Sequence, residues 1–240
     1  AQLLFLGRRH FEVEFLLEHK GISYPRVSTI LREAFPKPWL ARWYGAKGTQ
    51  EAERISGEAA GTGRAIHKAI ADYLNTGAVY TGDPVVLHGF LKAREWLEDP
   101  KNNISILKAE DETKDTIHFS QQYEYCCKPD LLLRFGDYPA ILDWKTNKDF
   151  YLEMIAQLAA NAQAVRESKP EWDPWSGYIV RLPKDGVSDI EVMKLKPGDL
   201  TKGLNIFLNA KRIWDSMKDW TKWKEELKQK KEDSNDIRLS

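Results

Sequence analysis

The sequence predicts an α/β protein in which a mixed central β-sheet is flanked by helices. Three observations predict this class: helical spacing of apolar residues over much of the first hundred residues, four short apolar runs between residues 104 and 144, and alternating helix and strand patterns after them. Such an order of elements is typical of a sheet on which helices pack.

The N-terminal elements follow from spacing and from residues that start or stop helices. Residues 11–17 alternate between apolar and polar side chains as a strand does. Ser28 is a candidate N-cap for a short helix that ends at Phe35, before two prolines. Glycines favour an interruption in the next helical stretch, because glycine lowers helix stability. The interrupting glycines are Gly57, Gly61 and Gly63, and the helices expected around them and after them lie at residues 39–56, 62–74 and 84–97.

The second half of the chain is expected to be rich in strands. Residues 136–139 and 184–186 have the composition of tight turns, so each is expected to join two strands into a hairpin. Residues 150–165 between them have helical spacing. The expected strands lie at residues 104–110, 118–127, 129–135, 140–144, 177–182 and 190–195.

A C-terminal helix is expected to begin at Pro197 or Thr201, with a frayed, solvated tail beyond Trp223. The chain then divides into three parts of one compact domain. These are a mainly helical part at residues 1–100, a core of sheet and helix at residues 101–200, and a C-terminal helix and tail at residues 201–240.

Composition limits the functional classes. The chain has 36 basic and 36 acidic residues, and this zero net charge disfavours a broad, sequence-independent nucleic-acid binder without excluding an enzyme that binds phosphates in a local groove. The two cysteines, Cys126 and Cys127, are adjacent and too few for a four-cysteine metal site. No apolar run has the length of a signal-peptide core or a membrane span. We therefore expect an intracellular, cytoplasmic protein without a membrane partner.

Two aspartates next to apolar runs carry the strongest chemical signal. Asp130 precedes Leu131–Phe135, and Asp143 lies within Ile141–Trp144, with Lys145 two residues later. Carboxylates are rarely buried without a partner. Because side chains alternate along a strand, Asp143 and Lys145 should project to the same face. Hard oxygen ligands of this kind suit Mg²⁺ or Mn²⁺, which supports phosphodiester hydrolysis.

These residues resemble the PD-(D/E)xK nuclease superfamily, and the wider pattern is similar to its RecB-type and mitochondrial genome maintenance exonuclease branch. The resemblance implies a restriction-endonuclease-like core with a helical N-terminal part. It also implies that Asp130 and Asp143 ligate the metal, that the Trp144 carbonyl completes the shell, and that Lys145 orients or helps to deprotonate water. The segments that carry it are Tyr24–Leu31, Gly63–His67, Asp130–Lys145 and Gln157–Ala162.

Three further residues receive roles from the resemblance, each with a simpler alternative. His67 is expected to be a metal ligand or phosphate contact, although a lone histidine on a helix is more often a core residue. Glu110 is expected to be an additional ligand or base, against a surface glutamate and against Glu112, which competes by alternation. Gln157 is expected to hold the phosphate or Lys145, against an exposed polar position.

The sequence departs from the family at Asn161, where an aromatic residue usually follows the glutamine, and it lacks the cysteines of the cluster-bearing branch. A separate feature is the aromatic segment around Trp39, Trp43 and Tyr44, with basic residues between them. It has the composition of a stacking surface for single-stranded DNA, but packing of an amphipathic helix explains it equally well. The lysines of residues 222–231 alternate with glutamates and indicate a solvated face.

The sequence thus predicts a divalent-metal-dependent deoxyribonuclease. The resemblance indicates an exonuclease acting on single-stranded ends or flaps during DNA replication or recombination. The alternatives are a structure-specific endonuclease, a nucleic-acid-binding protein without catalysis, and a tryptophan-rich structural protein.

Overall fold

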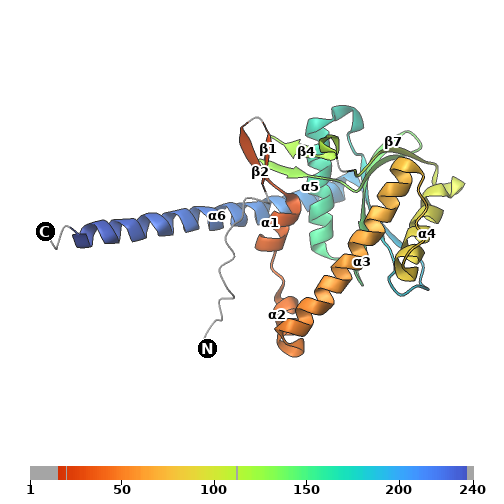
Figure 1. The fold of residues 1–240 in the computed structure, drawn as a ribbon. Helices are drawn as coiled ribbons and strands as arrows, with labels where there is room; N and C mark the ends of the chain where they lie inside the picture. Colours follow the sequence, from red (N-terminus) through yellow and green to blue (C-terminus); the bar gives the residue numbers. More distant parts are fainter. Residues whose placement is uncertain (1–15, 20, 112, 237–240) are drawn as a thin grey trace.

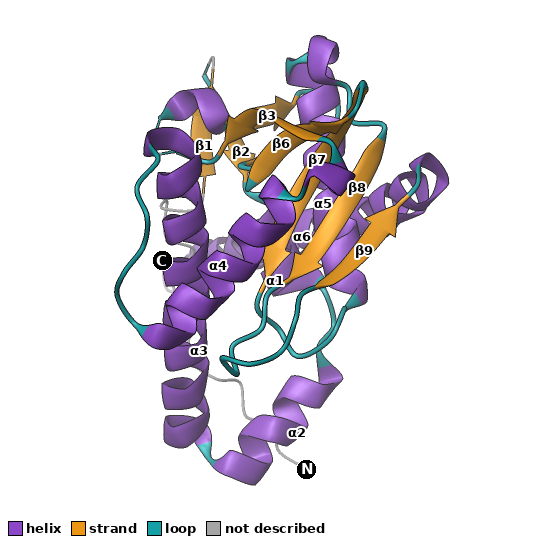
Figure 2. Cartoon of the chain, turned by 90° about the vertical axis from the view of Figure 1, so that its right-hand side faces the viewer, coloured by secondary structure: helices purple, strands orange, loops and turns teal. Residues whose placement is uncertain are grey.

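A computed structural model describes residues 16–19, 21–111 and 113–236 (Figure 1). Among these residues, a five-stranded mixed sheet in the order β3-β6-β7-β8-β9 forms the centre of the fold (Figure 2). β7 and β8 are parallel, and the other neighbours are antiparallel. The strands are β3 (Ile104–Ala109), β6 (Leu131–Phe135), β7 (Tyr138–Lys145), β8 (Ser176–Arg181) and β9 (Glu191–Leu195).

Helices cover both faces of this sheet, which confirms the predicted class. The long helix α3 (Thr49–Thr76) and α4 (Pro84–Glu98) pack on one face. The helix α5 (Leu152–Ser168) packs on the other face, together with the first part of α6 (Pro197–Asp236). α1 (Val27–Ala34) packs against α5 and α6, and the rest of α6 extends away from the body (Figure 1).

The smaller elements lie around this core. Their bounds are β1 (Leu16–His19), β2 (Ile22–Pro25), α2 (Pro38–Lys47), η2 (Pro100–Asn102), η3 (Lys114–Thr116), β4 (His118–Ser120), β5 (Tyr125–Cys127) and η4 (Pro170–Trp172). β1 pairs with β2 and β4 pairs with β5, each antiparallel. Within the described residues no helix has the length and apolarity to cross a bilayer.

Side-chain alternation along the central strands divides the core into two layers. Leu142 and Trp144 of β7 are buried with α3 and α4, whereas Ile141 is buried with α5. Full burial of a side chain of this size stabilises the fold by roughly 1.5–3 kcal/mol. The odd-numbered residues of β7 therefore face α5, and this places Asp143 and Lys145 on that side of the sheet.

The N-terminal helices differ from the sequence prediction. Gly48, with φ of +80°, separates α2 from α3, whereas Gly57, Gly61 and Gly63 lie inside an uninterrupted α3. Gly63 borders the part of α3 that packs on α4 and the sheet, and this packing outweighs its lower helix propensity. Gly57 and Gly61 precede that part of the helix, so packing on the core does not explain the helix there. Ser28 is not the N-cap of α1, because the helix already begins at Val27 and Arg26 occupies the cap position.

Two other expectations are corrected by the structure, and a third lies mostly outside the described residues. Residues 118–127 form two short strands, β4 and β5, rather than one, because a turn reverses the chain between them. α6 continues as a helix to Asp236, where a frayed tail was expected beyond Trp223. The strand expected at residues 11–17 lies mostly outside the described residues, which begin with β1 at Leu16.

Candidate active site

Three potential metal ligands from three parts of the fold converge at one end of the sheet. His67 lies on α3, Glu110 directly follows β3, and Asp130 directly precedes β6. Each offers one ligand atom, and these atoms all lie within 4.8 Å of one another. His67 Nδ1 is 3.4 Å from Asp130 Oδ2. Imidazole nitrogen and carboxylate oxygen together suit Mn²⁺ and related divalent cations.

Backbone hydrogen bonds fix the two carboxylates relative to the sheet. The Glu110 N–H donates to the Asp130 carbonyl at 2.9 Å, which continues the pairing of β3 with β6 beyond the strand ends. The Trp144 N–H donates to Asp130 Oδ2 at 2.7 Å. Asp130 is therefore tied to β7 through its side chain and to β3 through its backbone.

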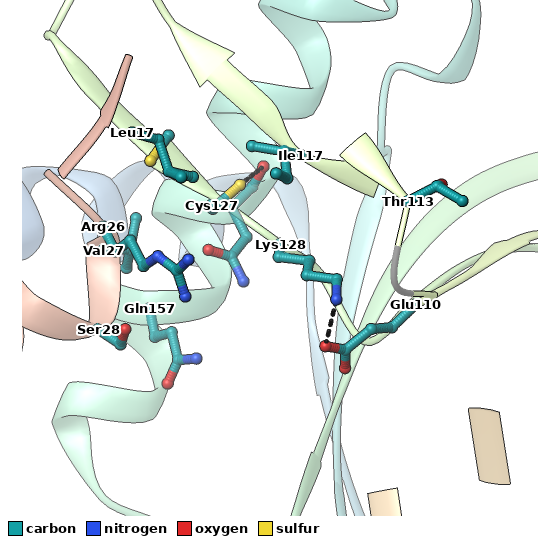
Figure 3. Close-up of a pocket in the computed structure, with 12 residues that line it drawn as sticks. Leu17, Arg26, Val27, Ser28, Glu110, Thr113, Ile117, Cys127, Lys128 and Gln157 are labelled. Carbon is teal, nitrogen blue, oxygen red and sulfur yellow. Dashed lines mark hydrogen bonds and ion pairs between the residues drawn. The ribbon is translucent and has the colours of Figure 1, made fainter. Parts of the chain in front are cut away.

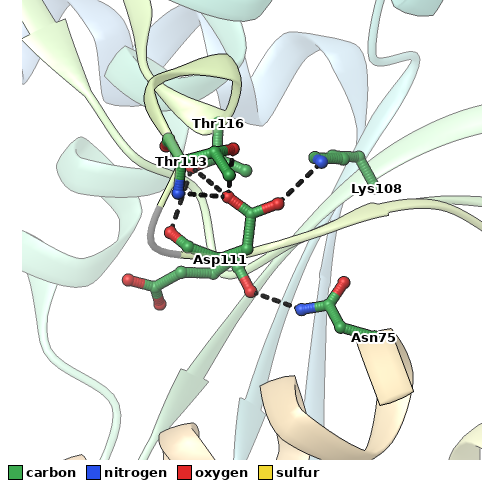
Figure 4. Close-up of polar contacts among 6 residues, drawn as sticks. Asn75, Lys108, Asp111, Thr113 and Thr116 are labelled. Carbon is green, nitrogen blue, oxygen red and sulfur yellow. Dashed lines mark hydrogen bonds and ion pairs between the residues drawn. The ribbon is translucent and has the colours of Figure 1, made fainter.

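The turn after Glu110 is held by its own polar contacts (Figure 4). Asp111 accepts hydrogen bonds from Lys108 Nζ and from the Thr113 N–H, both at 2.7 Å. Asn75, near the end of α3, donates to the Glu110 carbonyl at 2.9 Å. This last bond links the loop that carries Glu110 to the helix that carries His67, so the two ligands keep a fixed relation.

Gly63 allows α3 to approach the end of β7. A Cβ atom at this position would lie 2.9 Å from Thr146 Oγ1, closer than real Cβ contacts. His67 lies one helical turn after Gly63, so the same close approach brings its ring beside Asp130. The glycine that the sequence analysis expected to interrupt the helix instead sets the distance between helix and site.

Asp143 and Lys145 form an ion pair on the α5 face of β7. Lys145 Nζ also donates to Gln157 Oε1 on α5 at 3.0 Å. The prediction that Asp143 and Lys145 share a face is thus confirmed, and Gln157 contacts Lys145 as one of its two expected roles requires. Asp143 is not part of the group formed by His67, Glu110 and Asp130, because its carboxylate is directed toward Lys145.

The charges of the site shift the acid–base equilibria of its members. Burial raises the pKa of Asp143 to about 6, because the attraction of Lys145 does not offset burial together with the repulsion from Asp130. Burial acts in the same direction on Asp130, but His67, Lys145 and the Trp144 N–H lower its pKa overall. Burial disfavours the charged forms of His67 and Lys145, yet the neighbouring carboxylates raise the pKa of both.

The donor set fits a divalent cation. The Asp143 side chain is 3% exposed, and its Oδ2 has no hydrogen-bond partner of normal geometry although it faces the Lys145 ammonium. A buried ionised carboxylate is costly without a counter-charge. A cation bound between Glu110 and Asp130 would supply the counter-charge that these carboxylates otherwise take from Lys128 and His67.

A groove of about 960 Å³ is lined by His67, Glu110, Asp130 and Lys145, whereas Asp143 does not line it. One wall is α3, and the opposite wall contains the end of β7 and the residues that follow it. The groove also collects cationic side chains next to the carboxylates, as an enzyme acting on a phosphate backbone requires. These cationic residues are Arg64, Lys68, Lys128 and Lys145.

Some expected residues stay untested in their roles. The Trp144 indole is 2% exposed and packs edge-on against Trp96, and only its backbone N–H contacts the site through Asp130. A ligand role for the Trp144 carbonyl remains a prediction. Glu112, the competitor of Glu110, lies outside the described residues.

The aromatic segment has an unexpected setting. α2 contains no fully buried residue, but Trp43 and Tyr44 are half-buried with their rings edge-on to each other, and α2 contacts α3. Packing thus accounts for these two residues better than for Trp39. Trp39 is 52% exposed and stacks on Tyr151 at a ring-centroid distance of 6.3 Å.

Sequence reasoning missed Lys128. Its Nζ lies 3.0 Å from Glu110 Oε1, and it lines the groove. Its position directly before Pro129 and Asp130 is the only signal in the sequence, and nothing local identifies its partner on the neighbouring strand.

Comparison with protein-family models gave no match, and comparison with curated proteins gave none either. Among solved structures, the chain is similar to an alkaline exonuclease, LHK-Exo, from Laribacter hongkongensis, at 11% identity and a TM-score of 0.32, covering 67% of this chain and 84% of that one. A structure of LHK-Exo in complex with dAMP matches at 10% identity and a TM-score of 0.34, with the same coverage. The protein SSO0001 matches at 11% identity and a TM-score of 0.31, covering 78% of this chain and 84% of that one. TM-scores of this size do not establish a shared fold, so the function is argued from the site itself.

Proposed function

We propose that the protein is a divalent-metal-dependent deoxyribonuclease that hydrolyses phosphodiester bonds. The observation that carries the proposal is the convergence of His67, Glu110 and Asp130 beside the Asp143–Lys145 pair, in a groove that basic side chains also line. Structural ion pairs alone do not require two carboxylates and a histidine at one point.

Each part of the site has a distinct task. His67, Glu110 and Asp130, whose ligand atoms converge, would hold the cation. Asp143, which is paired with Lys145, is proposed as a further ligand. When bound, a divalent cation would polarise a phosphate oxygen. It would also lower the pKa of a water molecule that it holds, so that this water can act as a nucleophile at neutral pH. Lys145, fixed by Asp143 and Gln157, presents an ammonium group to the phosphate that enters the groove. Arg64 and Lys68 on α3 line the wall along which the rest of the strand would lie.

The finer assignment is an exonuclease acting on single-stranded ends or flaps in DNA replication or recombination. Its support is the resemblance of the sequence motifs and the exposed Trp39 of α2, which suits stacking with an unpaired base. A structure-specific endonuclease would use the same residues, so the two differ only in the need for a free end.

Degradation of labelled oligonucleotides in Mg²⁺ or Mn²⁺ tests the proposal. Wild-type protein should cleave, whereas Asp130→Asn and Asp143→Asn should lose at least about 10²-fold in rate because each removes a charge that holds the cation. Asp219→Asn, at an exposed position of α6, is the matched control and should retain full activity. Equal cleavage by wild type and both site variants would reject the assignment.

Blocking the ends separates the two modes of cleavage. An exonuclease should leave a circular single strand intact and degrade its linear form, with product length showing the polarity. Cleavage of the circle at an equal rate would favour the endonuclease.

A further inference from the structure

A second, smaller pocket of about 370 Å³ lies next to the proposed metal site (Figure 3). Glu110, Lys128 and Gln157 belong to its lining, and Glu110 and Lys128 also line the groove. Its volume falls within the roughly 300–1,000 Å³ that small-ligand pockets span. We call it the side pocket. No step assigned to the metal site uses it.

Asn161, in the lining of this pocket, has a side-chain oxygen without a hydrogen-bond partner. It lies on α5 one turn after Gln157, so both side chains project from the same side of the helix. Asn161 is 2% exposed, lines the side pocket, and its Oδ1 is buried without a hydrogen-bond partner. A buried polar atom without a partner destabilises a fold by roughly 1–3 kcal/mol, so its retention inside a packed helix points to a ligand that completes it.

The lining combines an apolar wall with polar and charged groups. Val27, Cys126 and Cys127 supply an apolar wall, and both thiols are buried and free. A carboxamide presents a donor and an acceptor side by side. A phosphate has oxygens only, so it would leave the amide oxygen of Asn161 unpaired, whereas the edge of a nucleobase offers both a donor and an acceptor.

The cationic residues of the side pocket suit the rest of a nucleotide. Arg26 lines it, and within the described part of the chain no ion pair engages the Arg26 guanidinium. Lys128 lines both the side pocket and the groove, and it forms an ion pair with Glu110. A nucleotide with its base in the pocket would therefore place phosphate oxygens between these cations and the metal ligands.

We propose that the side pocket binds the nucleobase of the nucleotide adjacent to the scissile phosphate, with the Asn161 carboxamide hydrogen-bonded to the base edge. The proposal rests on the proposed nuclease function and names the part of the substrate that the neighbouring pocket receives. Every base has an edge with adjacent donor and acceptor, so the pocket distinguishes nucleotides that carry a base from those that lack one.

Calorimetric titration with two probes tests it. The probes are deoxyadenosine 5′-monophosphate and deoxyribose 5-phosphate, which differ only by the base. Wild-type protein should bind the first about tenfold more tightly, the value expected for one or two net hydrogen bonds. Asn161→Leu should lose about tenfold for the nucleotide and remain unchanged for the sugar phosphate. If leucine at position 161 disturbs packing, Asn161→Ala replaces it, because α5 is rich in alanine. Asn205→Leu, at an exposed position of α6, is the control and should bind both probes as the wild type does.

The outcomes separate this proposal from the nuclease assignment. Equal affinity of wild type for both probes, undetectable nucleotide binding, or an equal loss for both probes in the Asn161 variants would overturn the base pocket. Asn161-dependent nucleotide binding by a protein that does not cleave DNA would keep the pocket and reject the nuclease. Cleavage of DNA without Asn161-dependent nucleotide binding would keep the nuclease assignment and reject the base pocket.

Discussion

The buried Asp143 carboxylate should destabilise the metal-free protein at neutral pH, and Asp143→Asn should remove this effect. Asparagine has the shape of the protonated aspartic acid and no charge. Lys145 keeps its hydrogen bond to Gln157 and the attraction of Asp130 in this variant. The substitution therefore changes the charge of the site with little change in packing.

The magnitude follows from the shifted equilibrium. Burial and the charge of Asp130 raise the pKa of Asp143 from 3.8 to about 6, with Lys145 opposing them. The folded protein thus binds this proton more tightly than the unfolded chain, so stability falls as pH rises from about 4 to 6. The pKa difference corresponds to at most about 3 kcal/mol, fully expressed above pH 6. At pH 7 Asp143→Asn should be more stable than wild type by up to this amount, and at pH 4 the two should be equal.

The pKa values of Asp130 and His67 are shifted away from this window. The pKa of Asp130 is lowered, so its contribution is lost only as pH falls below the ordinary range of a carboxyl group. The pKa of His67 is raised, so its contribution is present at low pH and is lost above about pH 6.5. Of Asp130, His67 and Asp143, Asp143 is the one whose pKa is shifted into the range between pH 4 and 6.

Urea unfolding followed by tryptophan fluorescence measures the effect, since the chain has nine tryptophans. Wild type, Asp143→Asn and the control Asp219→Asn are compared at pH 4, 5, 6 and 7 with a chelator present. A variant less stable than wild type at pH 7, or a stability difference that does not change between pH 4 and 7, would refute the reasoning. Added Mn²⁺ should stabilise wild type and leave Asp143→Asn nearly unchanged.

Three other predictions concern separate parts of the molecule. Lys145→Met should reduce cleavage by about 10²-fold or more while calorimetry still detects Mn²⁺ binding, because the ammonium group is not a ligand; loss of Mn²⁺ binding would contradict this role. Trp39→Ala should weaken single-stranded DNA binding by about 5- to 100-fold in fluorescence anisotropy, with unchanged thermal unfolding because α2 has no buried residue. Gly203→Ala should destabilise the protein by about 1–3 kcal/mol in urea unfolding, because its Cβ would lie 2.8 Å from the Ile155 carbonyl oxygen. Gly198→Ala meets nothing within 4 Å and should cause no loss.

Local patterns predicted most of the central sheet. The runs around Asp130 and Asp143 became β6 and β7, joined in a hairpin as expected. Pro84–Glu98 and the helix after Lys145 were also recognised, because their apolar spacing and end residues agree. The failures occurred where distant contacts override propensity.

α3 is the clearest of these failures. Its glycines lower helix propensity by roughly 1 kcal/mol each relative to alanine. From Gly63 onward the helix continues because its buried residues pack on α4 and the sheet and because Gly63 is required beside Thr146. Neither contact is visible in a local window of sequence.

Sequence alone determined that Asp143 and Lys145 project to the same side, because the alternation of side chains along a strand is a property of the backbone. It also identified His67, Glu110 and Gln157 as chemically suited residues, but it could not say which of them meet. Tertiary structure decided that His67, Glu110 and Asp130 converge, that Asp143 is directed toward Lys145, and that Lys128 joins Glu110. The physical reason is that strand neighbours and helix paths depend on the burial of many distant side chains, and that burial also sets the local electrostatic balance.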